Sequence, residues 1–377
     1  MNKMGNIKSL FYVTYQSFPA DTANSIQTIS NIKYFLKNGI DVTLFFPLRE
    51  NNSSDDLEII KNKYSINEDF KIVGKTHNLP FGKIKLFNSL FFLISHYLWA
   101  KKTVIDLLES QDEPDVYFTR SDWVFYLLSK EKKNVIFELH QYSKLRKILT
   151  NEALINEKAK IIFLNENLYR DFENKNALKG RYAILQNGVD LEKFENKVNK
   201  NKNEIVFLGR LTRFNDSRNI DFIVDSLLKM KKDYNLKIVG ATNKEINTFK
   251  KLFKTKFVKE NVVFYNQLNH QEAIEHLKSA EIGLLMNSNL NSHSLKYTSP
   301  LKYFEYLAAG LKIIAVDFDA HKKLPYSENI NFFKDGDYES FKLAINEMSN
   351  YKPIGIENLN QISLDHRVKN IIKLAEI

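Results

Sequence analysis

The sequence contains no cysteine among its 377 residues. This absence excludes disulfide bonds and thiolate metal sites, and it is compatible with a reducing compartment. The N-terminus also lacks the organisation of a signal peptide, because residues 1–6 lead directly into a strand-like run. We therefore expect a cytoplasmic protein.

Motifs of several common catalytic classes are missing as well. No G-x-G-x-x-G follows the first apolar run, and the chain has no P-loop lysine motif, G-x-S-x-G elbow or histidine pair at metal-binding spacing. A dinucleotide dehydrogenase thereby loses its main support, and we expect neither a metal nor a cofactor. We expect no nucleic-acid binding either, because the positive charge is spread along the chain and not grouped with stacking aromatics.

Long uncharged runs are scarce, and one segment raises the question of a membrane. Residues 86–100 carry no formal charge, yet they are too few to span a bilayer as a helix. Lysines flank this segment on both sides: Lys83, Lys85, Lys101 and Lys102. Two alternatives fit these residues. One is a helix half-buried against its own domain, and the other is peripheral contact of residues 83–102 with the anionic inner face of the cytoplasmic membrane.

The composition is otherwise that of a globular protein. Hydrophobic residues make up 44% and aromatic residues 13% of the chain, which excludes a disordered protein. The length favours two domains over a single core. The formal charge of +10 permits anionic partners but does not identify one.

Short apolar runs alternate with helical patterns in both halves of the chain. In the first half the runs lie at 7–15, 41–46, 115–119, 134–139 and 159–164; in the second, at 204–208, 236–239, 261–265, 282–286 and 311–316. The turn Gln186–Gly188 and a lysine-rich connector, residues 192–203, separate the two series. The pattern predicts an α/β protein with two Rossmann-like parallel sheets, while residues 51–81 show no clear pattern.

The segment 298–310 predicts a helix with an anion seat at its start. Ser299 is a good N-cap and Pro300 suits the first helical position. The free N–H groups of Leu301 and Lys302, together with the positive end of the helix dipole, can then hold a phosphate.

Glu305 lies further along this predicted helix, where its carboxylate can bind sugar hydroxyls beside a seated phosphate. A nucleoside diphosphate site is one interpretation of this segment. An ordinary capped helix of an α/β fold is the other, and local chemistry alone favours it.

Two further segments follow strands and so lie where parallel sheets bind ligands. Arg210 comes directly after the strand 204–208, with Arg213 and Arg218 in the same loop, and arginine binds phosphate bidentately. His140 follows the strand 134–139. A basic surface loop and a structural histidine remain the alternatives.

Taken together, these segments resemble the retaining GT-B glycosyltransferases of family four, also known as glycosyl transferases group 1. Residues 184–194 look like the interdomain "PNGVD…F" segment of that family, and residues 205–211 are similar to its "VGRL" strand and loop. Residues 236–240 resemble its "LxIVG" strand, and residues 299–310 are close to its donor motif "SPLKLFEYMAAG".

The first half fits the family more loosely, through residues 18–27 and 137–140. The resemblance implies a GT-B fold, with two Rossmann-like domains facing a central cleft and a C-terminal helix that crosses back to the first. We expect an acceptor-side domain at 1–185, a donor domain at 186–355 and the returning helix within 356–377.

The resemblance also implies roles for individual residues. His140, Arg210 and Glu305 would act at the reaction site, with Glu305 on the donor ribose and Arg210 on the diphosphate. Arg218 would replace the lysine of the family, in a loop about two residues longer. The complete donor set would be Arg210, Arg218, Ser299, Pro300, Leu301, Lys302 and Glu305, with Asn24 and Ser25 from the first half.

One departure concerns sugar recognition. The family commonly has a glutamate eight positions before the helix glutamate, where this chain has Tyr297. Donor identity therefore cannot be transferred from the family.

The activity implied is metal-independent sugar transfer, with retention, from a nucleotide-diphosphate sugar to a glycan or lipid-linked acceptor in bacterial surface polysaccharide synthesis. Two alternatives stay open: a non-catalytic subunit that binds a sugar nucleotide, and a GT-B sugar-nucleotide epimerase.

Overall fold

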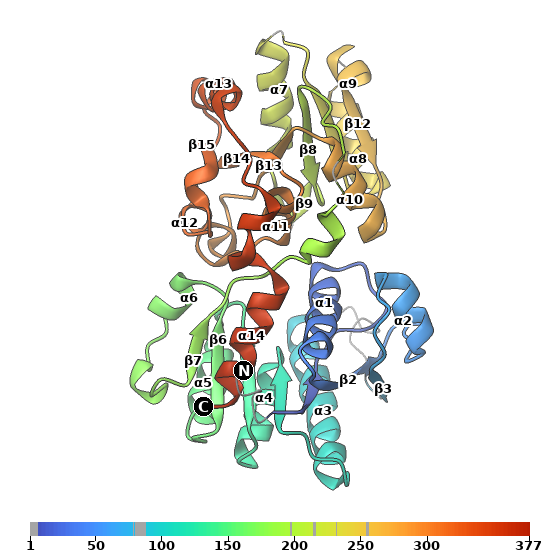
Figure 1. The fold of residues 1–377 in the computed structure, drawn as a ribbon, viewed down its shortest axis with the longest axis vertical. Coiled ribbons are helices and arrows are strands. Elements are labelled where there is room, and N and C mark those ends of the chain that lie inside the picture. The colour runs from blue at the N-terminus through green and yellow to red at the C-terminus, as the bar shows by residue number, and fades with distance from the viewer. Residues whose placement is uncertain are drawn as a thin grey trace. The chain divides into compact units, whose positions relative to one another are not determined.

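The chain folds into two compact units, Met1–Leu185 with Leu364–Ile377, and Gln186–Ser363 (Figure 1). A computed structural model describes residues 7–77, 79, 88–196, 198–213, 216–230, 232–253 and 256–377. Lys83 and Lys85, which belong to the proposed membrane segment, lie outside the described residues.

Unit 1 is a parallel sheet with the strand order β3-β2-β1-β4-β5-β6-β7. Its strands are β1 (Ser9–Val13), β2 (Asp41–Leu48), β3 (Lys71–Thr76), β4 (Val116–Thr119), β5 (Val135–Leu139), β6 (Ala159–Phe163) and β7 (Tyr182–Ile184). Its helices are α1 (Ala23–Lys37), α2 (Leu57–Tyr64), α3 (Asn88–Glu109), α4 (Asp122–Lys130), α5 (Lys144–Ala153), α6 (Glu166–Arg170) and α14 (Leu364–Ala375).

Unit 2 is a second parallel sheet with the order β12-β11-β8-β13-β14-β15, beside a two-stranded ribbon. Its strands are β8 (Glu204–Leu208), β9 (Thr212–Arg213), β10 (Asp216–Ser217), β11 (Asn235–Val239), β12 (Val262–Tyr265), β13 (Ile282–Leu285), β14 (Lys312–Val316) and β15 (Ile330–Phe333). Its helices are α7 (Ile220–Met230), α8 (Asn243–Leu252), α9 (Lys256–Asn261), α10 (His270–Ser279), α11 (Leu301–Ala308), α12 (Asp319–Lys322) and α13 (Tyr338–Asn346), with a π-helical turn at His293–Tyr297.

These sheets confirm the predicted α/β class with two Rossmann-like domains. The central strands are apolar on both faces: in β8, Ile205 and Phe207 enter one core of unit 2, while Val206 enters the other. This is the period of two expected for a strand covered on both sides by helices. The stretch 51–81, which showed no pattern, contains α2 and β3.

The strand orders place a topological switch point in each sheet. In unit 2 the chain runs from β8 outward to β11 and β12, and then returns to place β13 on the other side of β8. Open parallel sheets bind ligands beyond the carboxyl ends of the two strands at such a point. In unit 2, a ligand-binding site is therefore expected at the segments that follow β8 and β13.

The boundary near the C-terminus differs from the expected 355/356. Leu359 and Ile362 are buried in a core of unit 2, and the Val189 N–H donates to the Ile362 carbonyl at 2.9 Å. These contacts keep residues 356–363 in unit 2, and α14 begins only at Leu364.

Helix α14 is part of unit 1, where it packs against α1 and β7 (Figure 1). Val368, Ile371 and Leu374 enter the core, and the Arg367 guanidinium forms a buried ion pair with Glu138 of β5. Neither side chain is more than 3% exposed. The pair therefore ties the last helix to the middle of the sheet.

We expect Arg367→Met to lower the free energy of unfolding by about 3–5 kcal/mol, because it removes the principal counter-ion of a buried carboxylate. Lys369→Met in the same helix is the matched control. Its pair with Asp365 is surface-exposed and worth less than about 1 kcal/mol. Urea unfolding midpoints measure both variants, and equal midpoints would contradict the role given to Arg367.

Candidate functional site

Two cations converge on the backbone directly after β8. Gly209 has a φ of +123°, and a Cβ built there would lie 2.9 Å from Nη1 of Arg218 and 4.0 Å from Nζ of Lys302. A side chain at position 209 would therefore occupy the space beside these two positive groups. The aromatic ring of Phe207 lies beneath them, with its centre 4.4 Å from Lys302 Nζ and 5.9 Å from Arg218 Cζ.

The charge states of these cations reflect burial and mutual repulsion. Burial, followed by the charges of Arg218 and Arg213, holds the pKa of Lys302 well below its usual value, and Glu305 opposes this shift. Burial and Arg213 also lower the pKa of Arg218 to about 10. The Nε atom of Arg218 is buried and has no hydrogen-bond partner among the described residues. Such an arrangement is stabilised by an anion.

Helix α11 begins beside this cluster, one residue later than expected. The N-cap is Pro300, not Ser299, and it provides no side-chain cap for the first turn. Ser299 is used elsewhere: its Oγ accepts from the Asn187 N–H at 3.1 Å, and its carbonyl accepts from Asn187 Nδ2 at 2.5 Å. The start of α11 at Leu301 and Lys302 thus keeps backbone donors that a ligand can use.

Tyr306 fixes the position of α11 on the sheet. Its hydroxyl accepts from the Leu208 N–H at 2.9 Å and donates to the Leu284 carbonyl at 3.2 Å. Its ring lies on Gly283, where an added Cβ would come within 2.7 Å. The helix is therefore bound to both strands of the switch point, β8 and β13.

Glu305 is buried and is oriented by a histidine that the sequence did not point out. Its Oε1 lies 2.7 Å from Nε2 of His270, the first residue of α10. The other carboxylate oxygen has no hydrogen-bond partner among the residues described. Glu305 therefore presents a single oriented acceptor close to Lys302.

Arg210 is placed differently from Arg218. Its Nε donates to Glu245 Oε2 of α8 at 2.8 Å, and its side chain is 55% exposed. Arg210 and Glu245 both line a cavity of about 610 Å³ that extends between α8 and the start of α7. Of the two arginines expected at the phosphates, Arg218 lies over Gly209 and Arg210 lies at the edge of this cavity.

The loop after β13 contains a second buried network that sequence reasoning missed. His321 donates from Nδ1 to the Val316 carbonyl at 2.9 Å, so its Nε2 accepts from Asn287 Nδ2 at 3.1 Å. Tyr297, the residue found in place of the usual glutamate, ends the π-helical turn beyond this network.

The capping pattern Thr242-x-x-Glu245 was visible in the sequence, but the arginine bound to Glu245 could not be found from local patterns. The same holds for the contacts of His270 and His321.

His140 lies in unit 1, at the end of β5. The Arg120 guanidinium donates to its Nδ1 at 3.1 Å, and its Nε2 is hydrogen-bonded to Glu138. Because arginine can only donate, His140 is a neutral imidazole that donates from Nε2. Burial and the charge of Arg120 lower the pKa of His140 to about 4, so it stays neutral at physiological pH.

The two other residues expected from the first half lie at the start of α1. Ser25 is fully buried and completes a capping box with Thr22, while its hydroxyl also donates to the Ala20 carbonyl at 2.6 Å. Asn24 is half-buried, and its Oδ1 has no hydrogen-bond partner in the described part of the chain. Asn24 is thus better placed than Ser25 to receive a ligand.

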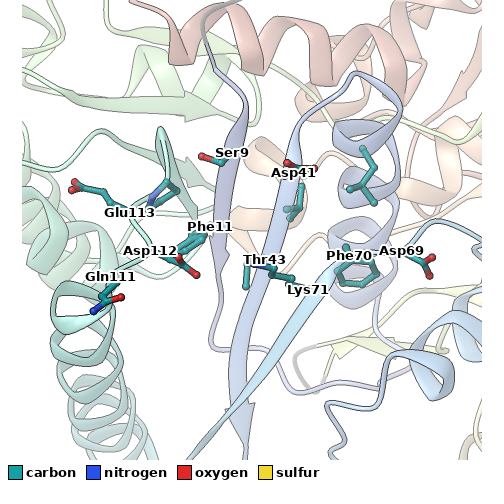
Figure 2. A pocket seen from close by; sticks show the side chains of 13 residues that line it. Ser9, Phe11, Asp41, Thr43, Asp69, Phe70, Lys71, Gln111, Asp112 and Glu113 are labelled. Atoms are coloured by element: carbon teal, nitrogen blue, oxygen red, sulfur yellow. The ribbon is translucent and has the colours of Figure 1, made fainter.

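A cavity of about 690 Å³ lies elsewhere in unit 1, at the amino ends of its strands. Figure 2 shows Ser9 and Asp41 beside the starts of β1 and β2, with Asp112 and Glu113 from the segment before β4. This is the opposite end of the strands from the one that binds ligands in parallel sheets, and none of the expected site residues lines it.

Neither a metal-binding cluster nor a membrane-spanning helix is found among the described residues. They contain no group of three or more His, Cys, Asp or Glu side chains that could hold a metal ion. Among the helices of this same part of the chain, none has both the length and the hydropathy needed to cross a bilayer.

The sequence of unit 2 can also be compared with known families. Residues 189–362 match the family model of the glycosyl transferases group 1. The match covers nearly all of unit 2 and confirms, for this unit, the resemblance to glycosyl transferases group 1 noted from the motifs. No curated protein sequence is a significant match.

Solved structures share the fold over nearly the whole chain. The lipopolysaccharide outer core galactosyltransferase WaaB is 14% identical with a TM-score of 0.64, over 97% of this chain and 98% of that one. A glycosyltransferase from Rickettsia africae is 14% identical, with a TM-score of 0.61 and coverages of 98% and 96%. An E. coli protein described as trehalose-6-phosphate, bound with UDP-2-fluoro glucose, is 11% identical, with a TM-score of 0.62 and coverages of 98% and 99%.

We expect binding of a nucleoside diphosphate at pH 9 to be accompanied by proton uptake. A bound anion raises the lowered pKa of Lys302 toward its ordinary value, and the phosphates are already fully ionised at this pH. Calorimetric titrations in two buffers of different ionisation heat measure this uptake.

Lys302→Met should abolish the uptake and weaken binding about tenfold or more. Its melting temperature should not fall, because the variant removes a half-buried amino group whose charged form neighbouring cations disfavour. Proton uptake that persists in Lys302→Met would contradict the assignment.

Proposed function

We propose that unit 2 binds a nucleotide-diphosphate sugar and that the protein transfers this sugar to a glycan or lipid-linked acceptor. The observation that carries the proposal is the convergence of Arg218 and Lys302 over Gly209, beside the uncapped start of α11. Groups of like charge held together at a switch point are stabilised by an anion with several negative charges. A diphosphate fits this requirement.

Within this proposal, the free oxygen of Glu305 accepts a hydrogen bond from a ribose hydroxyl. His270 holds the carboxylate in the orientation that this contact requires. The diphosphate lies against Arg218, Lys302 and the first N–H groups of α11, and the terminal N–H groups of Arg210 reach it from the edge.

The proposed reaction retains the anomeric configuration. The acceptor hydroxyl oxygen forms a bond to the anomeric carbon, the bond from that carbon to the phosphate oxygen breaks, and the departing phosphate takes the hydroxyl proton on the same face. Negative charge develops on the leaving diphosphate, where the guanidinium groups, Lys302 and the start of α11 stabilise it. In this scheme the side chains take the role that a metal ion has in other transferases.

We further propose a hexose as the transferred sugar and a cytoplasmic role in bacterial surface polysaccharide synthesis. The fold relatives support this choice of probe, since one is a lipopolysaccharide galactosyltransferase and another was solved with UDP-2-fluoro glucose. His140, being neutral and bound on both ring nitrogens, would act as a fixed polar group and not as a base.

The wild-type protein should release nucleoside diphosphate from one of UDP-glucose, UDP-galactose, GDP-mannose or ADP-glucose, and release should accelerate with a glycan or lipid-linked acceptor. Glu305→Gln should lower kcat/KM about tenfold or more, because one oriented acceptor is lost. Coupled diphosphate release and NMR of the product anomer are the measurements.

Other outcomes separate the alternatives. Conversion of the donor sugar with no acceptor present would indicate an epimerase, and binding without turnover would indicate a non-catalytic subunit. Normal turnover by both Glu305→Gln and Arg218→Met would contradict the site itself.

Peripheral membrane contact is proposed for α3 of unit 1. One face of α3 is buried through Trp99, Thr103 and Val104, while the opposite face exposes apolar side chains. Those side chains are Leu90, Leu93, Ile94, Leu98 and Ile105, each between 37% and 59% exposed. Lys101 and Lys102 are exposed on the same helix. An apolar stripe beside lysines suits an anionic bilayer surface.

The double variant Ile94→Ser/Leu98→Ser should lose binding to vesicles that contain phosphatidylglycerol, as measured by co-sedimentation at low salt. Ile59→Ser on α2 is the control, since Ile59 is 45% exposed and lies on another helix of the same unit. Lys101→Gln should weaken binding by about 1 kcal/mol. Equal sedimentation of all variants, or no binding by the wild type, would refute membrane contact through α3.

A further inference from the structure

We propose that Glu245 is a positioning residue, which holds the Arg210 guanidinium in the orientation that binds the donor diphosphate. This inference rests on the proposed function and concerns the diphosphate end of the same site. Glu245 lies at the third position of α8, outside the segments that resemble the family motifs.

The Glu245 carboxylate accepts five hydrogen bonds, from residues on two different elements. Two come from Thr242 at the start of α8, from N at 2.8 Å and from Oγ1 at 2.9 Å. The other three come from the loop after β8: Thr212 N at 3.0 Å, Thr212 Oγ1 at 2.7 Å and Arg210 Nε at 2.8 Å. A capping box alone needs only the local contacts with Thr242, so the remaining three bonds serve the loop.

The carboxylate is also built to remain charged. Its side chain is 9% exposed, and burial alone would raise its pKa. The hydrogen bonds from Thr242, Thr212 and Arg210 nevertheless hold the pKa of Glu245 at about 2. Glu245 is therefore a fixed negative acceptor for the arginine at every working pH.

The contact leaves the ligand-binding side of Arg210 available. Only Nε donates to Glu245, and the two terminal amino groups have no hydrogen-bond partner among the described residues. Because the guanidinium is planar, the bond at Nε fixes the plane in which the other four N–H groups lie. An arginine fixed in this way can bind two phosphate oxygens without first being ordered.

Glu245 also lies close enough to affect the other cations. Its charge raises the pKa of Arg218, whereas Arg213 and Arg210 lower it. A single carboxylate therefore orients one arginine and partly offsets the repulsion around a second.

Glu272 provides a matched control within the same unit. It occupies the third position of α10 and completes a capping box with Asn269, with contacts at 3.1 Å and 2.8 Å. Its carboxylate has no arginine partner among the described residues. Because glutamine also completes a capping box, Glu→Gln at either position preserves the helix start. At position 245 alone, the change removes the anionic acceptor of an arginine.

The experiment compares the wild type, Glu245→Gln, Glu272→Gln, Arg210→Met and the double variant Arg210→Met/Glu245→Gln. The dissociation constants of UDP, GDP and ADP are measured by calorimetry, and the tightest is followed. We expect Glu245→Gln to weaken binding about tenfold and Glu272→Gln less than about twofold. In the Arg210→Met background, Glu245→Gln should cause no further loss, because its effect acts through the arginine. In turnover assays, the effect of Glu245→Gln should be divided between KM and kcat in the same ratio as the effect of Arg210→Met.

Each failure has a distinct meaning. If the wild type binds no nucleoside diphosphate, the proposed function fails, and this inference with it. If the wild type binds but the two glutamine variants behave alike, or if Glu245→Gln weakens binding equally without Arg210, the inference alone is overturned.

Discussion

Repulsion between cations after β8 is the constraint on which the proposed donor site of unit 2 depends. Arg218 and Lys302 are brought together over Gly209 although the charge of Arg218 lowers the pKa of Lys302. Such an arrangement persists only if the surrounding structure holds it. Tyr306 supplies part of that support, because it ties α11 to Leu208 and Leu284, on the two strands of the switch point.

The contacts of Ser299 explain why the start of α11 has no side-chain cap. Ser299 would be a competent cap, but its hydroxyl and carbonyl are used to hold Asn187 in the segment that enters unit 2. The first turn of α11 therefore keeps its donors. Ser299 therefore attaches the entering chain and does not cap the helix, which leaves backbone donors for the proposed anion site.

Sequence patterns predicted the sheets well and the side-chain partnerships poorly. Runs such as 204–208 and 282–286 are apolar on both faces, so their period and length were sufficient. Glu305 and Lys302 could be placed because they share one helix with a clear start. His270, His321 and Glu245 could not, because each acts on a residue 34 or 35 positions away in the chain. Ser299 was misassigned because a local cap competes with a tertiary contact that no local pattern records.

The path of the chain through the two units has a consequence for the order of folding. Unit 2 is one continuous segment, whereas unit 1 lacks α14 until all of unit 2 has been made. During synthesis, all residues of unit 2 are therefore present before unit 1 is complete. The carboxylate of Glu138 has no Arg367 partner until unit 2 has been translated. Of the two units, the one whose strands come first in the sequence is completed second.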